Sequence, residues 1–183
     1  MNNILNLKRK DGIEVKAELK VLNISYLDKI MELQKIIIDG LENKELYADT
    51  EREEFEEYIK KNGKILGCVT EDDELIAMGV YAKKGYYKSN YGYDIGLENE
   101  ELLKVGQIES TVVKEEYRGN KLQKIICEEL EKIAVKEDTK ILCATASPYN
   151  EFSVNTFKNL GYEIKKDKLK YGGLRRYVLA KRV

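Results

Sequence analysis

The sequence predicts a mixed α/β fold in which a twisted, mixed β-sheet carries helices on both faces. Strand-like runs rich in β-branched residues alternate along the chain with runs whose apolar residues recur at helical spacing. A continuous apolar run at 141–146 lies between two helical patterns, which is typical of a strand buried on both faces. The chain has 183 residues, so we expect a single domain over 1–183, with a short extra strand near 4–8.

The start of the chain predicts a hairpin and then a helix. The runs at 4–8 and 14–22 flank Lys10-Asp11-Gly12, and an Asp-Gly pair between two alternating runs favours a tight turn. The phrase Ser25-Tyr26-Leu27-Asp28 has the pattern of a capping box. Apolar residues at helical spacing follow it, so we expect a helix over 25–41.

The middle of the chain predicts a second helix, a hairpin and a long connection. Thr50-Glu51-Arg52-Glu53 has the pattern of another capping box, and Gly63 is expected to end the helix that it starts. Apolar runs at 64–69 and 75–82 are joined by a short acidic turn, which indicates an antiparallel pair. The stretch 85–104 is rich in Tyr, Gly and Asn and is expected to be a connection.

The last third of the chain predicts alternating strands and helices. The helical patterns lie at 122–135 and 150–160, and the further strands at 107–113, 162–166 and 176–181. Regular alternation on the strand 107–113 predicts two faces, with Gln107, Glu109, Thr111 and Val113 on one and Ile108, Ser110 and Val112 on the other.

Composition excludes several classes of function. The chain has 32 basic and 33 acidic residues, so no basic excess suggests a nucleic-acid partner. It has no His, which removes His-based general bases, Ser-His-Asp triads and most zinc sites. We therefore expect no metal and no nucleic acid.

The cysteines and the hydropathy pattern suggest a location. Cys68, Cys127 and Cys143 lie far apart in apolar runs and predict reduced, buried thiols in a cytoplasmic protein. Cys143, next to the central strand, has the best remaining claim to a functional site. No apolar run approaches membrane-spanning length and no signal peptide is seen, so we expect no membrane partner.

The loop 114–123 predicts a phosphate site. It follows a strand, contains Arg118-Gly119-Asn120 and leads into an amphipathic helix. The first backbone N–H groups of a helix have no partner within the helix and converge at the positive end of its dipole. Such an N-terminus is a ready site for an anion. The alternative is an ordinary strand-turn-helix connection.

Two phrases make the chain resemble the GNAT superfamily of acyl-CoA-dependent N-acetyltransferases. The family's first motif, Arg/Gln-x-x-Gly-x-Gly/Ala, falls on Arg118, Lys121 and Gln123, of which only the Arg matches. The second motif, Asn-x-x-Ala/Ser-x-x-x-Tyr-x-x-x-Gly-Phe/Tyr, matches in all but its Tyr, where this chain has Phe157; it falls on Asn150, Ser153, Phe157, Gly161 and Tyr162. The order of elements from about residue 14 to 181 also resembles this family.

The resemblance implies a fold, a co-substrate and a reaction. The fold would have splayed fourth and fifth core strands, and acetyl-CoA would donate an acetyl group to a primary amine of a small molecule or peptide by direct attack in a ternary complex. The implied CoA-binding residues are Thr111, Val112, Val113, Arg118, Gly119, Asn120, Lys121, Leu122, Gln123, Asn150, Ser153 and Phe157. Lys121 would either present its N–H and a charge to the phosphates or point away. We expect a monomer or a homodimer.

The resemblance also implies a base and an acceptor pocket. Glu109 is the candidate general base, and the alternative is a structural ion pair with a Lys or Arg. Gln107 shares its predicted face and is a candidate residue of the acceptor site. The acceptor candidates are the loop tyrosines Tyr86, Tyr87, Tyr91 and Tyr93, with Glu45, Asp49 and Asp94 as acids that would attract a cationic amine. The alternative is a loop that packs on its own aromatics.

The departures from the family motifs leave two other functions open. Lys121, Gln123 and Phe157 would suit an acyl-CoA-binding protein of the same fold with weak or no turnover. Phe157 has no proton for the departing thiolate, and water or Tyr149 would have to supply one. The other alternative is an interaction module whose splayed strands bind a peptide.

Overall fold

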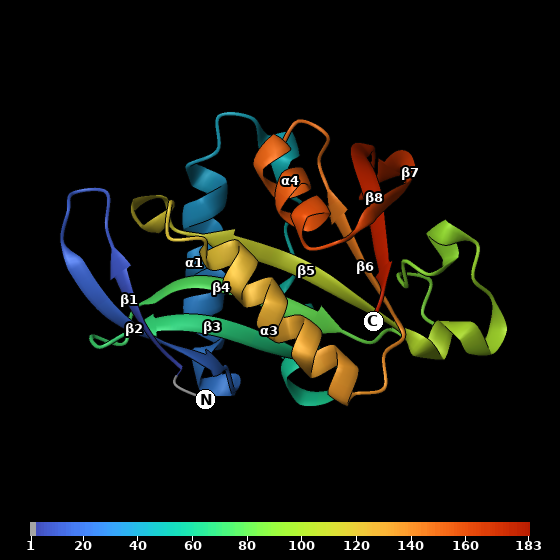
Figure 1. Cartoon of the computed structure of the whole chain (residues 1–183), viewed down its shortest axis with the longest axis horizontal. Helices are drawn as coiled ribbons and strands as arrows, with labels where there is room; N and C mark the ends of the chain where they lie inside the picture. The colour runs from blue at the N-terminus through green and yellow to red at the C-terminus, as the bar shows by residue number, and fades with distance from the viewer. Residues whose placement is uncertain (1–2) are drawn as a thin grey trace.

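The fold is an eight-stranded mixed sheet, seen in a computed structural model that describes residues 3–183 (Figure 1). The strands are β1 (Ile4–Lys8), β2 (Glu14–Val21), β3 (Gly63–Thr70), β4 (Leu75–Ala82), β5 (Val105–Val113), β6 (Ile141–Ala146), β7 (Glu163–Lys170) and β8 (Leu174–Arg182). They lie in the order β1-β2-β3-β4-β5-β6-β8-β7. The β5–β6 pair is parallel and the other neighbours are antiparallel.

Helices cover both faces of this sheet. They are α1 (Leu27–Asp39), α2 (Arg52–Glu57), α3 (Leu122–Lys136) and α4 (Glu151–Asn159). One core cluster joins α3 and α4 to the sheet through residues such as Ile126, Leu130 and Phe157. A second joins α1 and α2 to the opposite face through Ile30, Leu33 and Phe55. The predicted mixed α/β fold with helices on both faces is confirmed.

Neither predicted capping box forms, because the Ser25 hydroxyl bonds to the neighbouring Asn23 side chain and the Thr50 hydroxyl bonds to another element. Asn23 rather than Ser25 caps the chain here, and it caps a short 3₁₀ turn at 24–26 that precedes α1. The hydroxyl of Thr50 lies 2.9 Å from the Ser110 hydroxyl on β5, and Glu51 stands at the start of α2. A helix end that packs on the sheet can exchange a local cap for a longer-range bond.

The connection after β4 has more structure than the sequence indicates. It contains short 3₁₀ helices at Tyr93–Ile95 and Asn99–Lys104. Tyr91 packs with Cys143 and Val178 in a third core cluster over the C-terminal strands. The connection, at the right of Figure 1, therefore packs against β6 and β8.

A β-bulge interrupts the predicted alternation of β5. Ser110 adopts a left-handed conformation with φ +49°, and the register with β4 shifts between Met78 and Val80. Glu109 and Ser110 therefore both reach partners on the α2 side, Tyr58 and Thr50. A bulge places two residues opposite one and reverses the parity beyond it. The prediction that Glu109 and Thr111 share a face is wrong.

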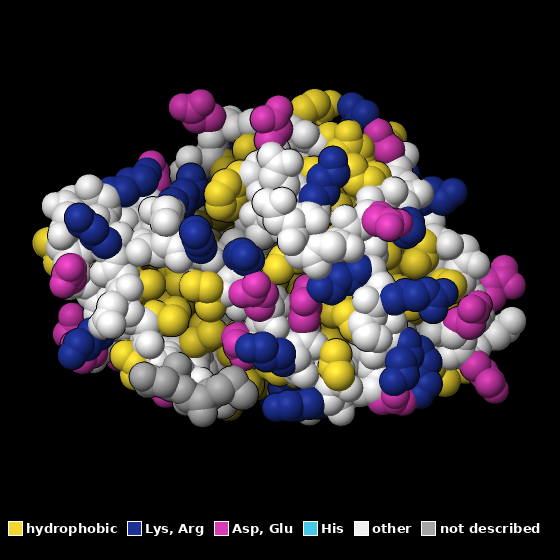
Figure 2. Space-filling model, in the orientation of Figure 1, with side chains coloured by type: hydrophobic (Ala, Val, Ile, Leu, Met, Phe, Trp, Pro, Cys, Tyr) yellow, Lys and Arg dark blue, Asp and Glu magenta, His cyan; other side chains and the backbone are white. Residues whose placement is uncertain are grey.

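The surface carries charges of both signs. Figure 2 shows Lys and Arg side chains interspersed with Asp and Glu over the face that α3 crosses. Among residues 3–183, none of the helices has the length and apolar character needed to cross a membrane.

Candidate active site

Two cavities meet where β5 and β6 separate. The pairing of these strands runs from Val105 with Ile141 to Ile108 with Ala144 and then stops, while β5 continues to Val113. A cavity of about 510 Å³ lies on the Glu109 side of this gap, and one of about 430 Å³ lies toward α3. We call them the acceptor cavity and the helix cavity. Both are lined by Leu46, Tyr47, Thr111, Asn150 and Ser153.

The helix cavity collects most of the residues expected to bind CoA. Its lining includes Thr111, Val112, Val113, Arg118, Gly119, Lys121, Leu122, Gln123, Asn150 and Ser153. Lys121 is the N-cap of α3 and makes no side-chain capping bond, and the first turn holds no acidic residue. The first N–H groups of a 15-residue helix are thus left without a side-chain acceptor beside this cavity. These features fit a phosphate group.

The turn into α3 requires two left-handed residues. Gly119 has φ +96° and Lys121 has φ +59°. Glycine adopts this conformation without a steric penalty, whereas a residue with a Cβ does so at a cost. This left-handed conformation explains why the family motif has Gly at the position of Lys121. Lys121 keeps the same turn, and its exposed side chain leaves the cavity lining intact.

Gln123 departs from the small residue of the family motif because its side chain bridges two elements. Its amide donates to the Thr111 hydroxyl on β5 and to the Ser153 hydroxyl on α4, each at 3.1 Å. Asn150 caps α4 by accepting a bond from the Ser153 N–H at 3.1 Å. These bonds fix the start of α4 against β5 at the junction of the cavities.

Asn120 faces away from the helix cavity and toward the extra strand β1. Its side-chain oxygen accepts from the Lys8 N–H at 2.9 Å, and its amide donates to the carbonyls of Lys8 and Tyr117, both at 2.8 Å. The Lys10 N–H also donates to the Glu116 carbonyl at 2.9 Å. The N-terminal hairpin thereby holds the loop in place, and Asn120 contributes through that loop.

In the acceptor cavity, both oxygens of the half-buried Glu109 accept bonds from protein groups. Gln107 donates its amide to Oε1, and the Tyr58 hydroxyl donates to Oε2 at 2.5 Å. The Gln107 oxygen accepts from the Tyr91 N–H at 3.0 Å, which fixes the amide so that its NH₂ faces Glu109. The predicted pairing of Gln107 and Glu109 on one face is confirmed.

The buried Lys84 contacts this carboxylate indirectly, through the Tyr58 hydroxyl. Lys84 donates to the Tyr58 hydroxyl at 2.8 Å and to Glu54 at 2.9 Å. The Tyr58 hydroxyl has a single proton to donate. Because Lys84 already donates a hydrogen bond to Glu54, the Tyr58 proton can be donated to Glu109. Burial and the neighbouring carboxylates raise the pKa of Tyr58 far above its ordinary value, so the phenol stays protonated. Glu109 has no Lys or Arg within ion-pair distance among residues 3–183.

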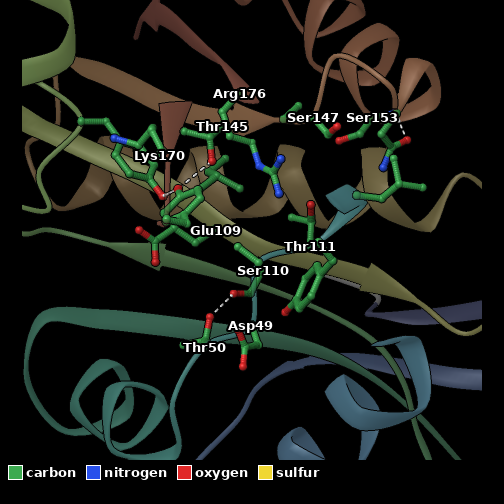
Figure 3. Close-up of a pocket in the computed structure, with 18 of the residues that line it drawn as sticks. Asp49, Thr50, Glu109, Ser110, Thr111, Thr145, Ser147, Ser153, Lys170 and Arg176 are labelled. Atoms are coloured by element: carbon green, nitrogen blue, oxygen red, sulfur yellow. Dashed lines mark hydrogen bonds between the residues drawn. The ribbon is translucent and has the colours of Figure 1, made fainter. Parts of the chain in front are cut away.

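The opposite wall of the acceptor cavity comes from β6 and the β7–β8 hairpin (Figure 3). The Tyr171 hydroxyl lies 2.8 Å from the Thr145 hydroxyl and 2.5 Å from that of Tyr91. Arg176 also lies on this wall and is 3% exposed. Burial lowers the pKa of Arg176, although a guanidinium in a protein still keeps its charge.

The structure brings only some of the predicted acceptor residues to the cavity. Tyr91 lines it, whereas Tyr86, Tyr87 and Tyr93 are exposed and lie outside its lining. Asp49 lines it as well, and Glu45 does not. Asp94 is paired with Lys168 and Lys170. Burial alone would raise the pKa of Asp94, but the bonds from the two lysines outweigh it and lower that pKa.

Phe157 and the cysteines are core residues by their surroundings. Phe157 is 2% exposed, packs edge-to-face on Tyr162 with ring centroids 5.2 Å apart, and also lines the acceptor cavity. Tyr149 is exposed and lies outside both cavity linings. All three cysteines are buried and unbridged, and burial raises the pKa of Cys143 to about 12. The prediction of reduced core thiols is confirmed.

Three further residues belong to the site although no sequence pattern marks them: Tyr58, Lys84 and Arg176. In the sequence, Tyr58 lies on the apolar side of a predicted helix, and Lys84 does not stand out from the other lysines of the chain. Arg176 is one of two adjacent arginines on β8, of which only Arg176 is buried. Burial of a charged side chain is the signal that marks Lys84 and Arg176, and it requires the fold.

Solved structures of other proteins share this fold. An acetyltransferase of the GNAT family from Streptococcus pneumoniae superimposes with a TM-score of 0.69 at 14% identity, over 91% of this chain and 99% of that chain. NAA60 of Arabidopsis thaliana in complex with acetyl-CoA gives 0.70 at 15% identity, over 91% and 98%. The same protein with a bisubstrate analogue gives 0.68 at 15% identity, over 91% and 97%. At these identities the likeness shows the fold.

The search of curated proteins gives no match to the chain. The model of the acetyltransferase (GNAT) family matches residues 30–162, which span the sheet from β3 to β6, most of α1, and all of α2, α3 and α4. The splay of β5 from β6, the uncapped start of α3 and the cap of α4 all lie within that match. The chain therefore belongs to the acetyltransferase (GNAT) family.

Proposed function

We propose that the protein is an N-acetyltransferase that moves the acetyl group of acetyl-CoA to a primary amine of a small molecule or peptide by direct attack in a ternary complex. The observation that carries this proposal is the meeting of two cavities at the gap between β5 and β6. One cavity ends at a helix N-terminus without a side-chain cap, and the other contains the Glu109 carboxylate, which pairs with no Lys or Arg of residues 3–183. Bound ligands in the two cavities would touch at Thr111.

The helix cavity is the proposed site of the CoA moiety. Backbone N–H groups from Arg118 to Gln123 would hold the pyrophosphate, with the positive charges of Arg118 and Lys121 at the rim. The apolar wall of Val112, Val113 and Leu122 would pack on the pantetheine arm. Residues 111–113 of β5 lie beyond its pairing with β6, so their backbone groups are available to an extended ligand.

Glu109 is the proposed general base. Acetyl-CoA supplies a thioester, whose carbonyl carbon forms the new C–N bond as the C–S bond breaks and sulfur takes the electron pair. The amine nitrogen loses a proton in this exchange, and Glu109 accepts it directly or through one water. Gln107 and Tyr58 hold the carboxylate in place, and its remaining lone pairs can still receive that proton.

The leaving thiolate needs no side-chain acid in this scheme. Phe157 stands where the family motif has a Tyr, and a thiol resembles Cys in acidity, with a reference pKa of about 8.5. Water entering from the open cavities would protonate the thiolate. The three unbridged thiols of the chain support a cytoplasmic location.

A binding test followed by a turnover test separates this proposal from its alternatives. Acetyl-CoA at about 100 times its dissociation constant should add roughly 2.7 kcal/mol of stability, seen as a rise in melting temperature. CoA release is then measured with a panel of primary amines. No stabilisation by acetyl-CoA would contradict the proposal and favour a peptide-binding module. Stabilisation without CoA release for any amine would favour an acyl-CoA-binding protein.

A further inference from the structure

Arg176 is a buried cation that no carboxylate of residues 3–183 approaches within ion-pair distance, although the negative charge of Glu45 acts on it from farther away and favours its charged form. Its guanidinium lies on the wall of the acceptor cavity and is 3% exposed. Nη1 donates to the Arg175 carbonyl at 2.8 Å, and Nη2 is buried without a hydrogen-bond partner. The guanidinium carbon lies 5.8 Å from the centre of the Tyr171 ring, so the ring supports the side chain but gives Nη2 no hydrogen-bond acceptor.

The other cations near this cavity are already satisfied by carboxylates. Lys168 and Lys170 both bond to Asp94, and Lys84 bonds to Glu54. In the described part of the chain, no ion pair involves Arg176. An unpaired buried charge is costly, and proteins keep one where a ligand completes it. Arg176 is therefore the one lining cation of residues 3–183 whose charge is left for something in the cavity.

The direction of the side chain shows where that anion would sit. In Figure 3 the guanidinium of Arg176 points from β8 into the cavity, toward the strand that carries Glu109, Ser110 and Thr111. Asp49 and Glu109 lie on the other walls and have no lysine or arginine partner among the described residues. The cavity thus presents an unpaired cation on one side and unpaired carboxylates on the other.

We propose that the acceptor is an amine that also bears a carboxylate, and that Arg176 binds this carboxylate. A guanidinium offers parallel N–H groups that match the two oxygens of a carboxylate, which makes the pair both strong and directional. The ammonium end of the acceptor lies toward Asp49 and Glu109 before it loses its proton. This inference rests on the proposed acetyl transfer and narrows its acceptor to amino acids and related amino carboxylates.

Matched acceptor pairs test the inference directly. CoA release is measured for amino acids and for the corresponding amides, such as glycine with glycinamide and 4-aminobutanoate with 4-aminobutanamide. The two members of a pair differ in one charge and little in size. We expect kcat/KM to be higher for the best acid than for its amide by about 30-fold or more, as for the loss of one buried charged partner. The amine of the amide is less basic, so a larger fraction of it is neutral at a given pH. This difference favours the amide and cannot produce the expected preference for the acid.

Variants of the two adjacent arginines separate recognition of the acceptor carboxylate by Arg176 from a general effect of positive charge on β8. Arg176→Gln should bring the acid-to-amide ratio of kcat/KM to within about threefold, and Arg176→Lys should keep part of the preference. Arg175→Gln is the matched control, because Arg175 pairs with Asp167 at the surface and lines neither cavity. It should leave the ratio unchanged. The rise in melting temperature with acetyl-CoA should be the same in all of these variants.

A product-binding measurement covers variants that turn over poorly. With CoA present, N-acetylglycine should raise the melting temperature of the wild-type protein and N-acetylglycinamide should not, and Arg176→Gln should remove this difference. Equal kcat/KM for acids and amides in the wild-type protein would overturn the inference and leave acetyl transfer intact. An Arg176→Gln variant that folds and keeps the acid preference would also overturn it. Absence of any effect of acetyl-CoA would overturn the proposed function instead.

Discussion

The helix cavity and the acceptor cavity are built from different parts of the chain. Most of the helix cavity comes from one continuous stretch, the end of β5 and the start of α3, and the groups proposed to bind there are backbone N–H groups. The acceptor cavity gathers side chains from the segment before α2, from β5, from β6 and from the β7–β8 hairpin. We therefore expect the helix cavity to tolerate side-chain changes such as Lys121 and the acceptor cavity to depend on individual side chains.

The largest test of this difference is the removal of the proposed base. Glu109→Gln keeps the shape of the side chain and can no longer accept the amine proton. Turnover should fall by roughly 100-fold or more. The affinity for acetyl-CoA should stay nearly the same, because Glu109 does not line the helix cavity. Steady-state kinetics and a thermal shift with acetyl-CoA measure the two effects separately.

Glu163→Gln is the matched control for this change. Glu163 pairs with Lys165 on the surface of β7 and is remote from both linings. Its loss should leave turnover unchanged. If Glu109→Gln keeps turnover within a factor of two, Glu109 is structural and bulk water serves as the base.

A smaller effect is expected from the residue that positions Glu109. Tyr58→Phe removes the hydroxyl that lies between Lys84 and the two carboxylates. Loss of a hydrogen bond to a charged group costs about 1.5–3 kcal/mol, so kcat should fall roughly 20-fold. Acetyl-CoA affinity should again be unchanged, because this network lies outside the helix cavity.

A second tyrosine gives the control for Tyr58. The Tyr26 hydroxyl bonds to Asp73 at the surface, so Tyr26→Phe removes an equal group far from the cavities. It should change kcat by less than about twofold. A Tyr58→Phe variant with full activity would show that Gln107 alone positions the base.

A charge change at the helix cavity should alter the affinity for acetyl-CoA and leave turnover nearly unchanged, the reverse of the changes around Glu109. Arg118→Glu places a negative charge beside the proposed pyrophosphate site and should weaken acetyl-CoA binding by at least about tenfold, roughly 1.4 kcal/mol. The kcat at saturating acetyl-CoA should change little. Titration calorimetry with acetyl-CoA, repeated at high salt, measures the effect, which should shrink as salt screens the exposed charge.

Lys132→Glu makes the same change of charge at the far end of α3. Position 132 lies roughly 15 Å along the helix from its start, nearly twice the Debye length of about 8 Å at physiological salt. This variant should bind acetyl-CoA like the wild type. Equal binding by Arg118→Glu would place the pyrophosphate elsewhere.

The same contrast explains what sequence reasoning could and could not find. The loop before α3 and the cap of α4 are local patterns, so the resemblance, the splayed fold and the helix cavity could be predicted from them. The bulge at Ser110 has no glycine or proline to mark it, and regular alternation therefore gave the wrong face for Thr111. The bonds around Glu109 join residues that are far apart in the chain, and no local pattern shows that Lys84 or Arg176 is buried.

Phe157 gives the smallest expected effect and tests whether the junction of the cavities needs an acid. Phe157→Tyr adds a hydroxyl on a ring that lines the acceptor cavity, at the position where the family motif has its Tyr. If water already protonates the thiolate, kcat should change by less than about fivefold, roughly 1 kcal/mol. Single-turnover kinetics at several pH values provide the measurement, and they separate the chemical step from product release.

Tyr149→Phe is the companion variant, because Tyr149 is the other phenol near the start of α4. It is 55% exposed and lines neither cavity, so its loss should be nearly silent. A gain of 100-fold or more in Phe157→Tyr would show that protonation of the thiolate limits the natural protein. A loss of that size in Tyr149→Phe, with acetyl-CoA binding retained, would show that the acid has moved to Tyr149. Small effects in both variants would leave water as the proton donor. Protonation of the thiolate at the junction would then need no acidic side chain, just as the proposed phosphate site in the helix cavity relies on backbone groups.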